Sequence, residues 1–521
     1  MPQSSAQTNA LTLGKGTLLS RLLGFVRDAV IAALIGGGGT ADALLLAFRI
    51  PNTARQLLAE GAFAYVLVPG YRERKELGQN YAWQYIRSLS VALFLLLALV
   101  ALCGYIFSKP LVFLLAPGFA DTPGIHNLAA AFMGLCLLSL PLVAGAAVTS
   151  SALMAEGRFH PPAYSSALFN FVIIIAAGIA FAFYGAGHSS APFILCWGVI
   201  AAGIVQWVYQ SSFLYRMGFS PIGSFSLAAP ETRRSLRALP GSLFGVGGHQ
   251  ANLLAATFLA SFLAEGSVSA LYFAERLIGF PLGIIGASMG LAALSDLSAI
   301  APEDRSAADY AEKKDLFTKR LIKAGRITLF FALPAAVGTA CLAEPLTAVI
   351  FGRGEFAASD VARTSNALLA YMAGLPALAF VRPLLAGIGA LRDTRAPLKA
   401  ALLSFGATFA AGIILLAANA PWGPALAVSF GAYVNAALLI RVLKKHGFPP
   451  LPSLSWLARA LAANAIMAAC VIGCSAAFSS NLTKAGTVPL GIAVYFIAAY
   501  CMRLEETALL RSITGRLLRR K

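Results

Sequence analysis

Charged residues are scarce in this sequence. Asp, Glu, Lys and Arg together make up only 12% of its 521 residues, whereas hydrophobic residues make up 58%. An average soluble domain carries about 25% charged residues, so this chain has too little charge for a water-facing surface. The composition therefore excludes a soluble protein and predicts an all-α polytopic membrane protein.

Acidic residues are the scarcer of the two charges: the chain has 22 Asp and Glu against 40 Lys and Arg, a formal net charge of +18. Such an excess can indicate nucleic-acid binding, but here the cations gather in alternate loops, as the positive-inside rule describes. The basic loops contain Arg72–Lys75, Arg158, Arg216–Arg237, Arg305–Arg326, Arg392–Lys399, Arg441–Lys445 and Arg511–Lys521. The other loops hold only Lys109, Arg353 and Lys484. We therefore expect both termini in the cytoplasm and no nucleic-acid partner.

Cysteine is also rare, and its placement excludes a disulfide framework. The seven cysteines all lie in apolar segments, and no His or acidic residue accompanies Cys470 and Cys474, which share a helix face. The stretch Gly14–Thr17 resembles part of a phosphate-binding loop, but the full spacing and the preceding strand are absent. We therefore expect no metal, nucleotide or other cofactor, and without a nucleophile–base pair we expect no enzymatic activity.

Long apolar segments fill most of the chain. A helical span needs about 20 mostly apolar residues. Segments that meet this requirement lie at residues 17–36, 41–69, 84–108, 128–155, 162–185, 191–215, 238–263, 267–299, 326–351, 362–389, 398–418, 422–443, 454–477 and 485–507. The turns between them are short and leave no room for a soluble domain. The sequence thus predicts a multi-pass protein with fourteen transmembrane helices.

The two halves of the chain resemble each other. Three pairs match in chain order at nearly the same separation: Ala43–Arg49 with Ala270–Arg276, Pro110 with Pro345, and Arg158 with Arg392. These matches predict two homologous lobes of six helices each. Parallel repeats of this kind usually enclose a substrate site at their interface and expose it to each side of the membrane in turn.

The expected domain organisation follows from this duplication. It comprises an N-lobe at 1–218, a cytoplasmic linker at 219–237, a C-lobe at 238–446, and two extra helices with a basic tail at 447–521. Within the C-lobe, residues 303–323 are predicted to form an amphipathic helix that lies on the cytoplasmic face of the membrane.

Charged side chains interrupt the apolar segments, although a charge at the bilayer centre costs about 2.5–3.5 kcal/mol. The cations are Arg21, Arg27, Arg49, Arg55, Arg276 and Arg382, and the acids are Asp28, Asp42, Glu60 and Glu275. One interpretation is that they form structural ion pairs between helices. Arg21 and Asp28 share a helix face and are candidates for such a pair, whereas the neighbours Arg27 and Asp28 are expected to point apart.

The surplus of arginine indicates more than ion pairing. Arginine offers a planar fork of donors that suits phosphate, and it does not deprotonate at working pH. A water-filled cavity lined by several such groups predicts an anionic, phosphorylated substrate.

Several short motifs in the chain are characteristic. The amino-terminal motifs are Ser20-Arg21-Leu22-Leu23-Gly24-Phe25-Val26-Arg27-Asp28, Thr40-Ala41-Asp42-Ala43, Pro51-Asn52, Ala59-Glu60-Gly61-Ala62-Phe63 and Val68-Pro69. The later motifs are Ala116-Pro117-Gly118-Phe119, Gly266-Ser267-Val268-Ser269, Glu275-Arg276-Leu277 and Asp393-Thr394-Arg395-Ala396-Pro397. These motifs resemble those of the MurJ (MviN) family, lipid II flippases of the multidrug/oligosaccharidyl-lipid/polysaccharide exporter superfamily. The resemblance is strongest in the first two predicted spans.

This resemblance implies fourteen helices in two lobes around a central cationic cavity, with helices thirteen and fourteen forming a groove for a long lipid tail. The essential cavity residues of the family fall on Arg21, Arg27, Arg55, Arg276 and Asp42. Arg49 and Arg382 rank second. Structural or gating roles are assigned to Asp28, Glu60, Glu275, Gly24 and Pro51.

The expected function is translocation of lipid II, the undecaprenyl-diphosphate-linked peptidoglycan precursor, across the bacterial cytoplasmic membrane by alternating access. The membrane potential or an unidentified ion is the expected energy source. Lipid II, membrane lipids and cell-wall synthesis proteins are the expected partners. Two alternatives stay open: a flippase for another polyprenyl-diphosphate-linked oligosaccharide, and a small-molecule exporter of the same superfamily.

Overall fold

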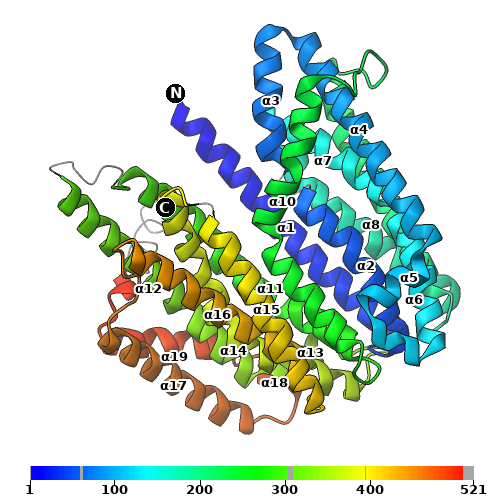
Figure 1. Cartoon of the computed structure of the whole chain (residues 1–521). Helices are drawn as coiled ribbons and strands as arrows, with labels where there is room; N and C mark the ends of the chain where they lie inside the picture. Colours follow the sequence, from blue (N-terminus) through cyan, green and yellow to red (C-terminus); the bar gives the residue numbers. More distant parts are fainter. Residues whose placement is uncertain (1, 59–62, 303–308, 394, 509–521) are drawn as a thin grey trace, which may run out of the picture. The chain divides into compact units, whose positions relative to one another are not determined.

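The computed structural model of the chain describes residues 2–58, 63–302, 309–393 and 395–508 (Figure 1). Within these ranges the regular structure is helical and contains no strand, which confirms the all-α prediction. The chain groups into two compact units. Unit 1 comprises Met1–Ser269 and Phe351–Asp360, and unit 2 comprises Ala270–Ile350 and Val361–Lys521. The lobe boundaries expected from the internal repeat remain a prediction.

Unit 1 contains the first ten α-helices. They are α1 (Pro2–Ile35), α2 (Gly39–Leu57), α3 (Phe63–Leu77), α4 (Gln79–Ile106), α5 (Ser108–Leu115), α6 (Pro123–Leu137), α7 (Leu140–Ala155), α8 (His160–Tyr184), α9 (Ala191–Tyr215) and α10 (Pro230–Ala260). A short 3-10 helix, η2 (Pro117–Asp121), joins α5 to α6.

Unit 2 holds nearly all of the remaining helices. They are α11 (Ser267–Ala299), α12 (Tyr310–Cys341), α13 (Ala343–Phe351), α14 (Ala358–Ala390), α15 (Arg395–Ala417), α16 (Gly423–Lys445), α17 (Leu454–Ala476), α18 (Asn481–Ala485), α19 (Val488–Cys501) and the 3-10 helix η3 (Glu505–Thr507).

Ten helical segments of the described chain are long and apolar enough to cross a membrane. Each overlaps a predicted span. The other four predicted spans coincide with α1, α2, α10 and α11. These four helices are not among the ten because they contain charged residues or residues whose side chains the structure does not describe. The presence of multiple membrane helices is thus confirmed, whereas the count of fourteen remains a prediction.

The span expected at 41–69 covers α2, which continues through Pro51 to Leu57, and α3, which begins at Phe63; residues 59–62 lie outside the described residues. One predicted segment differs from the structure. Residues 310–323, expected in a separate amphipathic helix, are instead the first turns of α12, which continues to Cys341. Ion pairs one turn apart, Lys313 with Asp309 and Lys319 with Asp315, favour this charged extension of the helix. Residues 303–308 lie outside the described residues.

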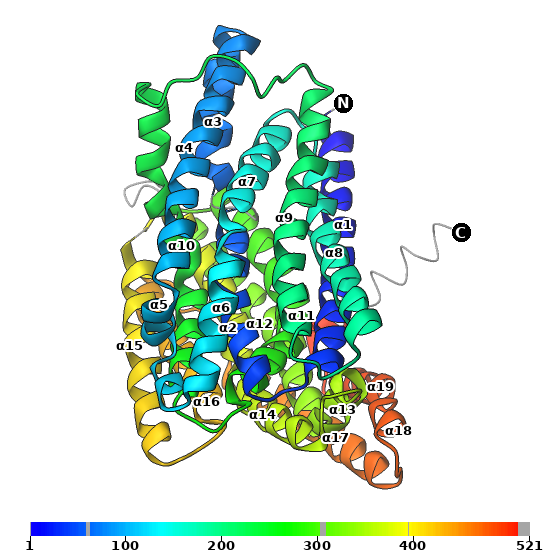
Figure 2. The ribbon, with the colours of Figure 1, turned by 90° about the vertical axis from the view of Figure 1, so that its right-hand side faces the viewer.

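The first helix packs closely against α8, which lies beside α9 (Figure 2). Small residues permit this approach, as they do between many membrane helices. A Cβ atom added to Gly16 would lie 2.5 Å from the carbonyl oxygen of Ala163, and one added to Gly24 would lie 3.3 Å from Asn170 Nδ2. Gly24 therefore sets the distance between α1 and a polar side chain of α8.

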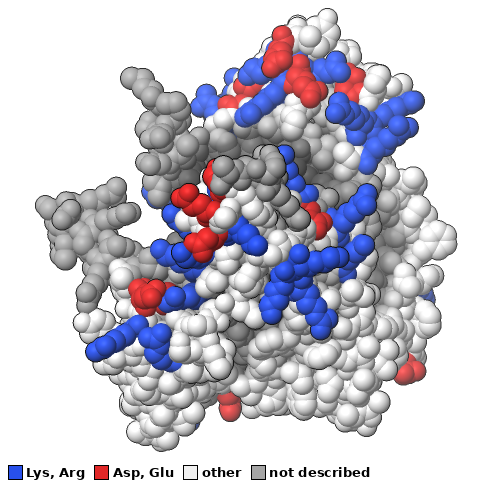
Figure 3. All heavy atoms as spheres, turned by 60° about the vertical axis from the view of Figure 1, so that its left-hand side comes forward, with Lys and Arg blue, Asp and Glu red and all other residues white. Residues whose placement is uncertain are grey.

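Large apolar side chains cover much of the outer surface. On α4, Leu95 is 53% exposed and Leu99 is 59% exposed. Wide areas of the face in Figure 3 carry no charge, and the Lys and Arg side chains gather in limited zones. Such exposure would be unfavourable in water and fits a hydrocarbon surrounding.

Candidate functional site

Arg27 lies in a network of buried hydrogen bonds within unit 1. Its Nε and Nη2 atoms donate to Asp28 Oδ1 at 2.9 and 2.6 Å, and its Nη1 atom donates to Asn170 Oδ1 at 2.9 Å. Arg27 is 4% exposed and Asp28 is 1% exposed. The expectation that these two neighbours point apart is therefore wrong. The long arginine side chain folds back onto the next carboxylate, because burial makes an unpaired charge costly.

Arg55 is held near the end of α2 by a second set of partners. Its Nη1 atom donates to Ser166 Oγ at 3.1 Å, and its Nη2 atom donates to Asn52 Oδ1 at 3.2 Å. The guanidinium also lies 5.2 Å from the ring centroid of Phe169. Hydroxyl, amide and aromatic groups are thus among the partners that hold this cation in place.

One face of α8 thus contacts both arginines. Ser166, Phe169 and Asn170 are spaced three and four residues apart and lie on the same side of the helix. Asn170 also donates from Nδ2 to the carbonyl oxygen of Ser20 at 2.9 Å, which fixes its amide relative to α1. Sequence reasoning missed these three residues. The available signal was a polar pair, Ser166 and Asn170, one turn apart in a mostly apolar helix.

Asp42 caps the start of α11. Its two carboxylate oxygens accept hydrogen bonds from the backbone N–H groups of Gly266 and Ser269, each at 2.7 Å. The hydroxyl of Ser269 donates to the carbonyl oxygen of Gly37 at 2.8 Å. A carboxylate at a helix N-terminus satisfies free N–H groups and interacts favourably with the helix dipole. Asp42 therefore joins the beginning of α2 to the beginning of α11.

The turn between α1 and α2 is fixed by the segment 351–360. The N–H of Gly37 donates to Asp360 Oδ2 at 3.2 Å, and the N–H of Glu355 donates to the carbonyl oxygen of Ala33 at 3.0 Å. The last carbonyl groups of α1 lack partners within their own helix, so this segment supplies one. These contacts and those of Asp42 lie at the same end of unit 1.

Arg276 lies in unit 2, on α11. Its Nη2 atom donates to the hydroxyl oxygen of Tyr272 at 2.9 Å, and its guanidinium lies 4.7 Å from the centroid of the same ring. Glu275 and Arg276 are both partly exposed, and Arg382 on α14 is exposed.

The other predicted site residues belong to unit 1. Arg21 is partly exposed and Arg49 is 7% exposed. Glu60 lies outside the described residues. In unit 1, Arg27 and Arg55 thus both contact the same face of α8. The expected cavity that they share with Arg276 remains a prediction.

A second polar cluster occupies the basic end of unit 1, outside the predicted spans. Glu156, just after α7, accepts hydrogen bonds from Lys75 Nζ at 2.6 and 2.7 Å and from the Tyr71 hydroxyl at 2.6 Å. Burial favours the neutral form of this carboxyl, but the hydrogen bonds from Lys75 and Tyr71 outweigh it and lower the pKa of Glu156. The cluster joins α3 to the end of α7 and holds a structural ion pair.

No group of three His, Cys, Asp or Glu side chains in the described chain is arranged to hold a metal ion. The polar groups described above are hydrogen-bond donors and acceptors inside apolar helices. Such an arrangement can bind and release an anion, and the arginine forks suit phosphate oxygens.

Comparison with known proteins gives a consistent result. The family model described as Lipid II flippase MurJ matches residues 31–492. A probable lipid II flippase MurJ of Rhizobium meliloti (strain 1021) is 32% identical over 511 residues, covering 94% of this chain and 92% of the relative. The Lipid II flippase MurJ of Burkholderia cenocepacia is 31% identical over 453 residues, covering 86% and 85%.

Solved structures share the fold. A structure described as lipid II flippase MurJ in an inward closed conformation matches with a TM-score of 0.80 and 23% identity, covering 94% of this chain and 98% of that one. An inward-facing multidrug transporter of the MATE family and MOP superfamily matches with a TM-score of 0.57 and 15% identity, covering 82% and 94%.

Proposed function

This chain belongs to the MurJ family of lipid II flippases, and we propose that it moves lipid II from the cytoplasmic to the outer leaflet of the bacterial cytoplasmic membrane. The observation that carries this proposal is the α8 face of Ser166, Phe169 and Asn170, which holds two arginine forks in apolar surroundings.

Substrate binding depends on the arginines. Arg21, Arg27, Arg55 and Arg276 bind the diphosphate and the adjacent sugar, while the polyprenyl chain stays in lipid against the helices of residues 447–521. Arg27 exchanges its contact with Asp28 for phosphate oxygens, and Asn170 keeps the fork in place during the exchange. The diphosphate carries one negative charge on each phosphate, and it competes well for a guanidinium because charge-assisted, bidentate contacts are the strongest hydrogen bonds.

Asp42 acts as the gate on the side opposite to the basic loops. Its bonds to Gly266 and Ser269 hold α2 and α11 together at that end, and they must open when the substrate leaves. Alternating access then requires these two backbone contacts to form and break in each cycle.

The membrane potential supplies the driving force. It acts with about 2.3 kcal/mol per elementary charge per 100 mV, so export of a diphosphate anion from a negative interior is downhill. Both termini lie in the cytoplasm, next to the basic loops. The chain is a transporter without covalent chemistry and needs no nucleotide, and no ion site is required for this driving force.

Reconstitution tests the proposal. Proteoliposomes containing the protein should move fluorescent lipid II to the opposite leaflet, and Arg55→Ala should abolish the movement while the protein stays folded and inserted. Full activity with a different polyprenyl-linked oligosaccharide, and none with lipid II, would instead support the alternative flippase. A cationic-drug exporter would require an excess of acidic side chains, which the embedded residues of this chain do not provide.

A further inference from the structure

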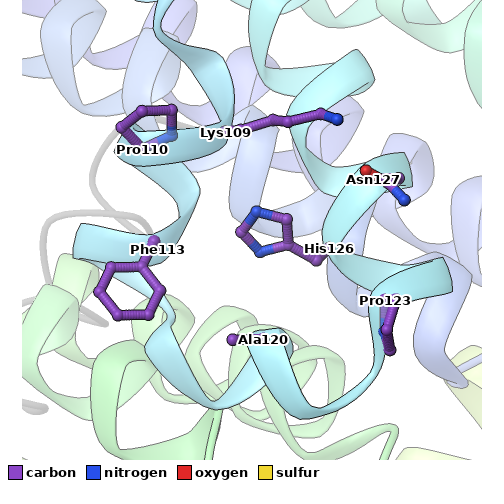
Figure 4. A pocket seen from close by; sticks show the side chains of 7 residues that line it. All are labelled: Lys109, Pro110, Phe113, Ala120, Pro123, His126 and Asn127. Atoms are coloured by element: carbon purple, nitrogen blue, oxygen red, sulfur yellow. The ribbon is translucent and has the colours of Figure 1, made fainter.

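A cavity of about 540 Å³ lies between α5, η2 and α6 in unit 1, apart from the arginines (Figure 4). Its lining includes Lys109, Pro110 and Phe113 from α5, and Pro123, His126 and Asn127 from α6. This volume is within the range of ligand-binding pockets, about 300–1,000 Å³.

The polar residues in this lining are Lys109, His126 and Asn127. Lys109 extends from α5 toward α6, and the ring of His126 projects from α6 toward Phe113 (Figure 4). The Nδ1 atom of His126 is buried and has no hydrogen-bond partner among the described residues. A buried polar atom without a partner is costly. A ligand that offered a hydrogen-bonding group to His126 and negative charge to Lys109 would remove this cost.

The position of Lys109 is unusual for its charge. It lies at the end of α4 opposite to Arg74 and Lys75, and a helix of 28 residues separates the two ends by roughly 40 Å. Lys109 is one of three cations in the loops of that side, where the positive-inside rule disfavours them. A cation kept at such a place is well suited to a local anionic partner.

The surroundings of the cavity are apolar. Phe113 on its wall is 57% exposed, and the neighbouring side chains Phe107 and Leu114 are 60% and 69% exposed. Aromatic residues near the ends of membrane helices typically lie at the level of the lipid headgroups. The opening therefore meets lipid and interfacial water together, which favours an amphiphilic ligand over a free ion.

We propose that this cavity binds the phosphate headgroup of an anionic phospholipid from the outer leaflet. Lys109 contacts the phosphate oxygens, His126 and Asn127 form hydrogen bonds to the headgroup, and Phe113 with the two prolines packs against the first carbons of the acyl chains. The site is separate from the α8 face and does not rest on the proposed transport of lipid II.

Lipid retention by the purified protein tests this site. Native mass spectrometry after exchange into mixed phosphatidylglycerol and phosphatidylcholine should show selective retention of phosphatidylglycerol. Lys109→Gln combined with His126→Ala should weaken this retention about tenfold, since a charge-assisted contact is lost. Lys484→Gln, which removes another cation from the same predicted side, should leave the retention of phosphatidylglycerol unchanged. Lys109→Arg, which keeps the positive charge, should retain phosphatidylglycerol as the wild type does.

The remaining outcomes distinguish the sources of the phosphate. Equal phosphatidylglycerol retention by the wild type and the double variant, with both proteins folded by circular dichroism, would overturn the proposal. If lipid II, but not added phosphatidylglycerol, displaced the retained lipid, the cavity would be a site for the transported lipid. This result would also overturn the proposal. Displacement by millimolar inorganic phosphate alone would show a free-anion site rather than a lipid site. Failure of lipid II transport would leave the retention result intact, because the two assays are independent.

Discussion

Replacing Asn170 by alanine should weaken lipid II binding without unfolding the protein. Asn170 is 5% exposed and makes two hydrogen bonds of 2.9 Å, one from Arg27 Nη1 to its Oδ1 atom and one from its Nδ2 atom to the Ser20 carbonyl. The alanine variant removes both. Arg27 then retains, of its contacts in this network, only those with Asp28, so its fork is no longer held in position for phosphate.

The size of the effect follows from the lost contact with Arg27. A hydrogen bond to a charged group contributes about 1.5–3 kcal/mol, and each 1.4 kcal/mol corresponds to about a tenfold change in affinity. We therefore expect lipid II to bind roughly 10- to 100-fold more weakly to the Asn170→Ala variant. Asn170→Asp keeps the shape but adds a negative charge beside Arg27, so it should weaken lipid II binding as well.

Binding should be measured by equilibrium titration of fluorescent lipid II into protein in nanodiscs, and transport by leaflet exchange in proteoliposomes. Ser404→Ala is a matched control, because Ser404 is 1% exposed in α15 and donates to the carbonyl oxygen of Gly431 at 2.8 Å. It should retain wild-type affinity. Wild-type affinity in Asn170→Ala would refute the positioning role of Asn170, and an equal loss in both variants would reduce it to a general effect of helix packing.

Three further predictions concern other contacts. Arg27→Lys should retain only part of the transport rate, because the charge remains while the bidentate fork is lost; the proteoliposome assay checks this. Asp42→Ala should lower the free energy of unfolding by about 0.5–2 kcal/mol, since the N–H groups it caps, among them that of Ser269, lose their acceptor; thermal unfolding in detergent checks this. Glu156→Gln should make the stability of the protein depend less on pH in acid. A carboxyl whose pKa is lowered by Lys75 stabilises the fold above its ordinary pKa of 4.5 and loses this contribution as the pH falls through the lowered pKa. Melting temperatures between about pH 6 and pH 3 check this prediction.

The contradicting results are specific to each contact. Full transport by Arg27→Lys would show that a point charge is enough. An unchanged free energy of unfolding in Asp42→Ala would show that water replaces the cap at no cost. A wild-type pH profile in Glu156→Gln would mean that its ion pair with Lys75 also persists in the unfolded chain.

The sequence was sufficient for the membrane class and the family. Both follow from the composition, the length of the apolar segments and short sequence motifs, which can be read from residues that are neighbours in the chain. The partner of Arg27 was not predictable, because helical geometry alone separates adjacent side chains and gives no account of a long flexible arginine folding back in a buried site. The contacts of Asn170 and Asp42 join residues far apart in the chain, so no local pattern shows them.

The charged turns of α12 were assigned to a surface helix because their polarity suggested a helix boundary that the backbone does not have.

Thiol labelling with bound substrate tests the central proposition that arginines from both halves of the chain bind one lipid-linked diphosphate. A cysteine would replace either Arg27 or Arg276 in an inserted variant that lacks the seven native cysteines, so that the other arginines still bind lipid II. We expect a membrane-impermeant thiol reagent to label each position, and lipid II, but not phosphatidylglycerol, to protect each of them. Absence of labelling, or labelling that lipid II does not change, would contradict it.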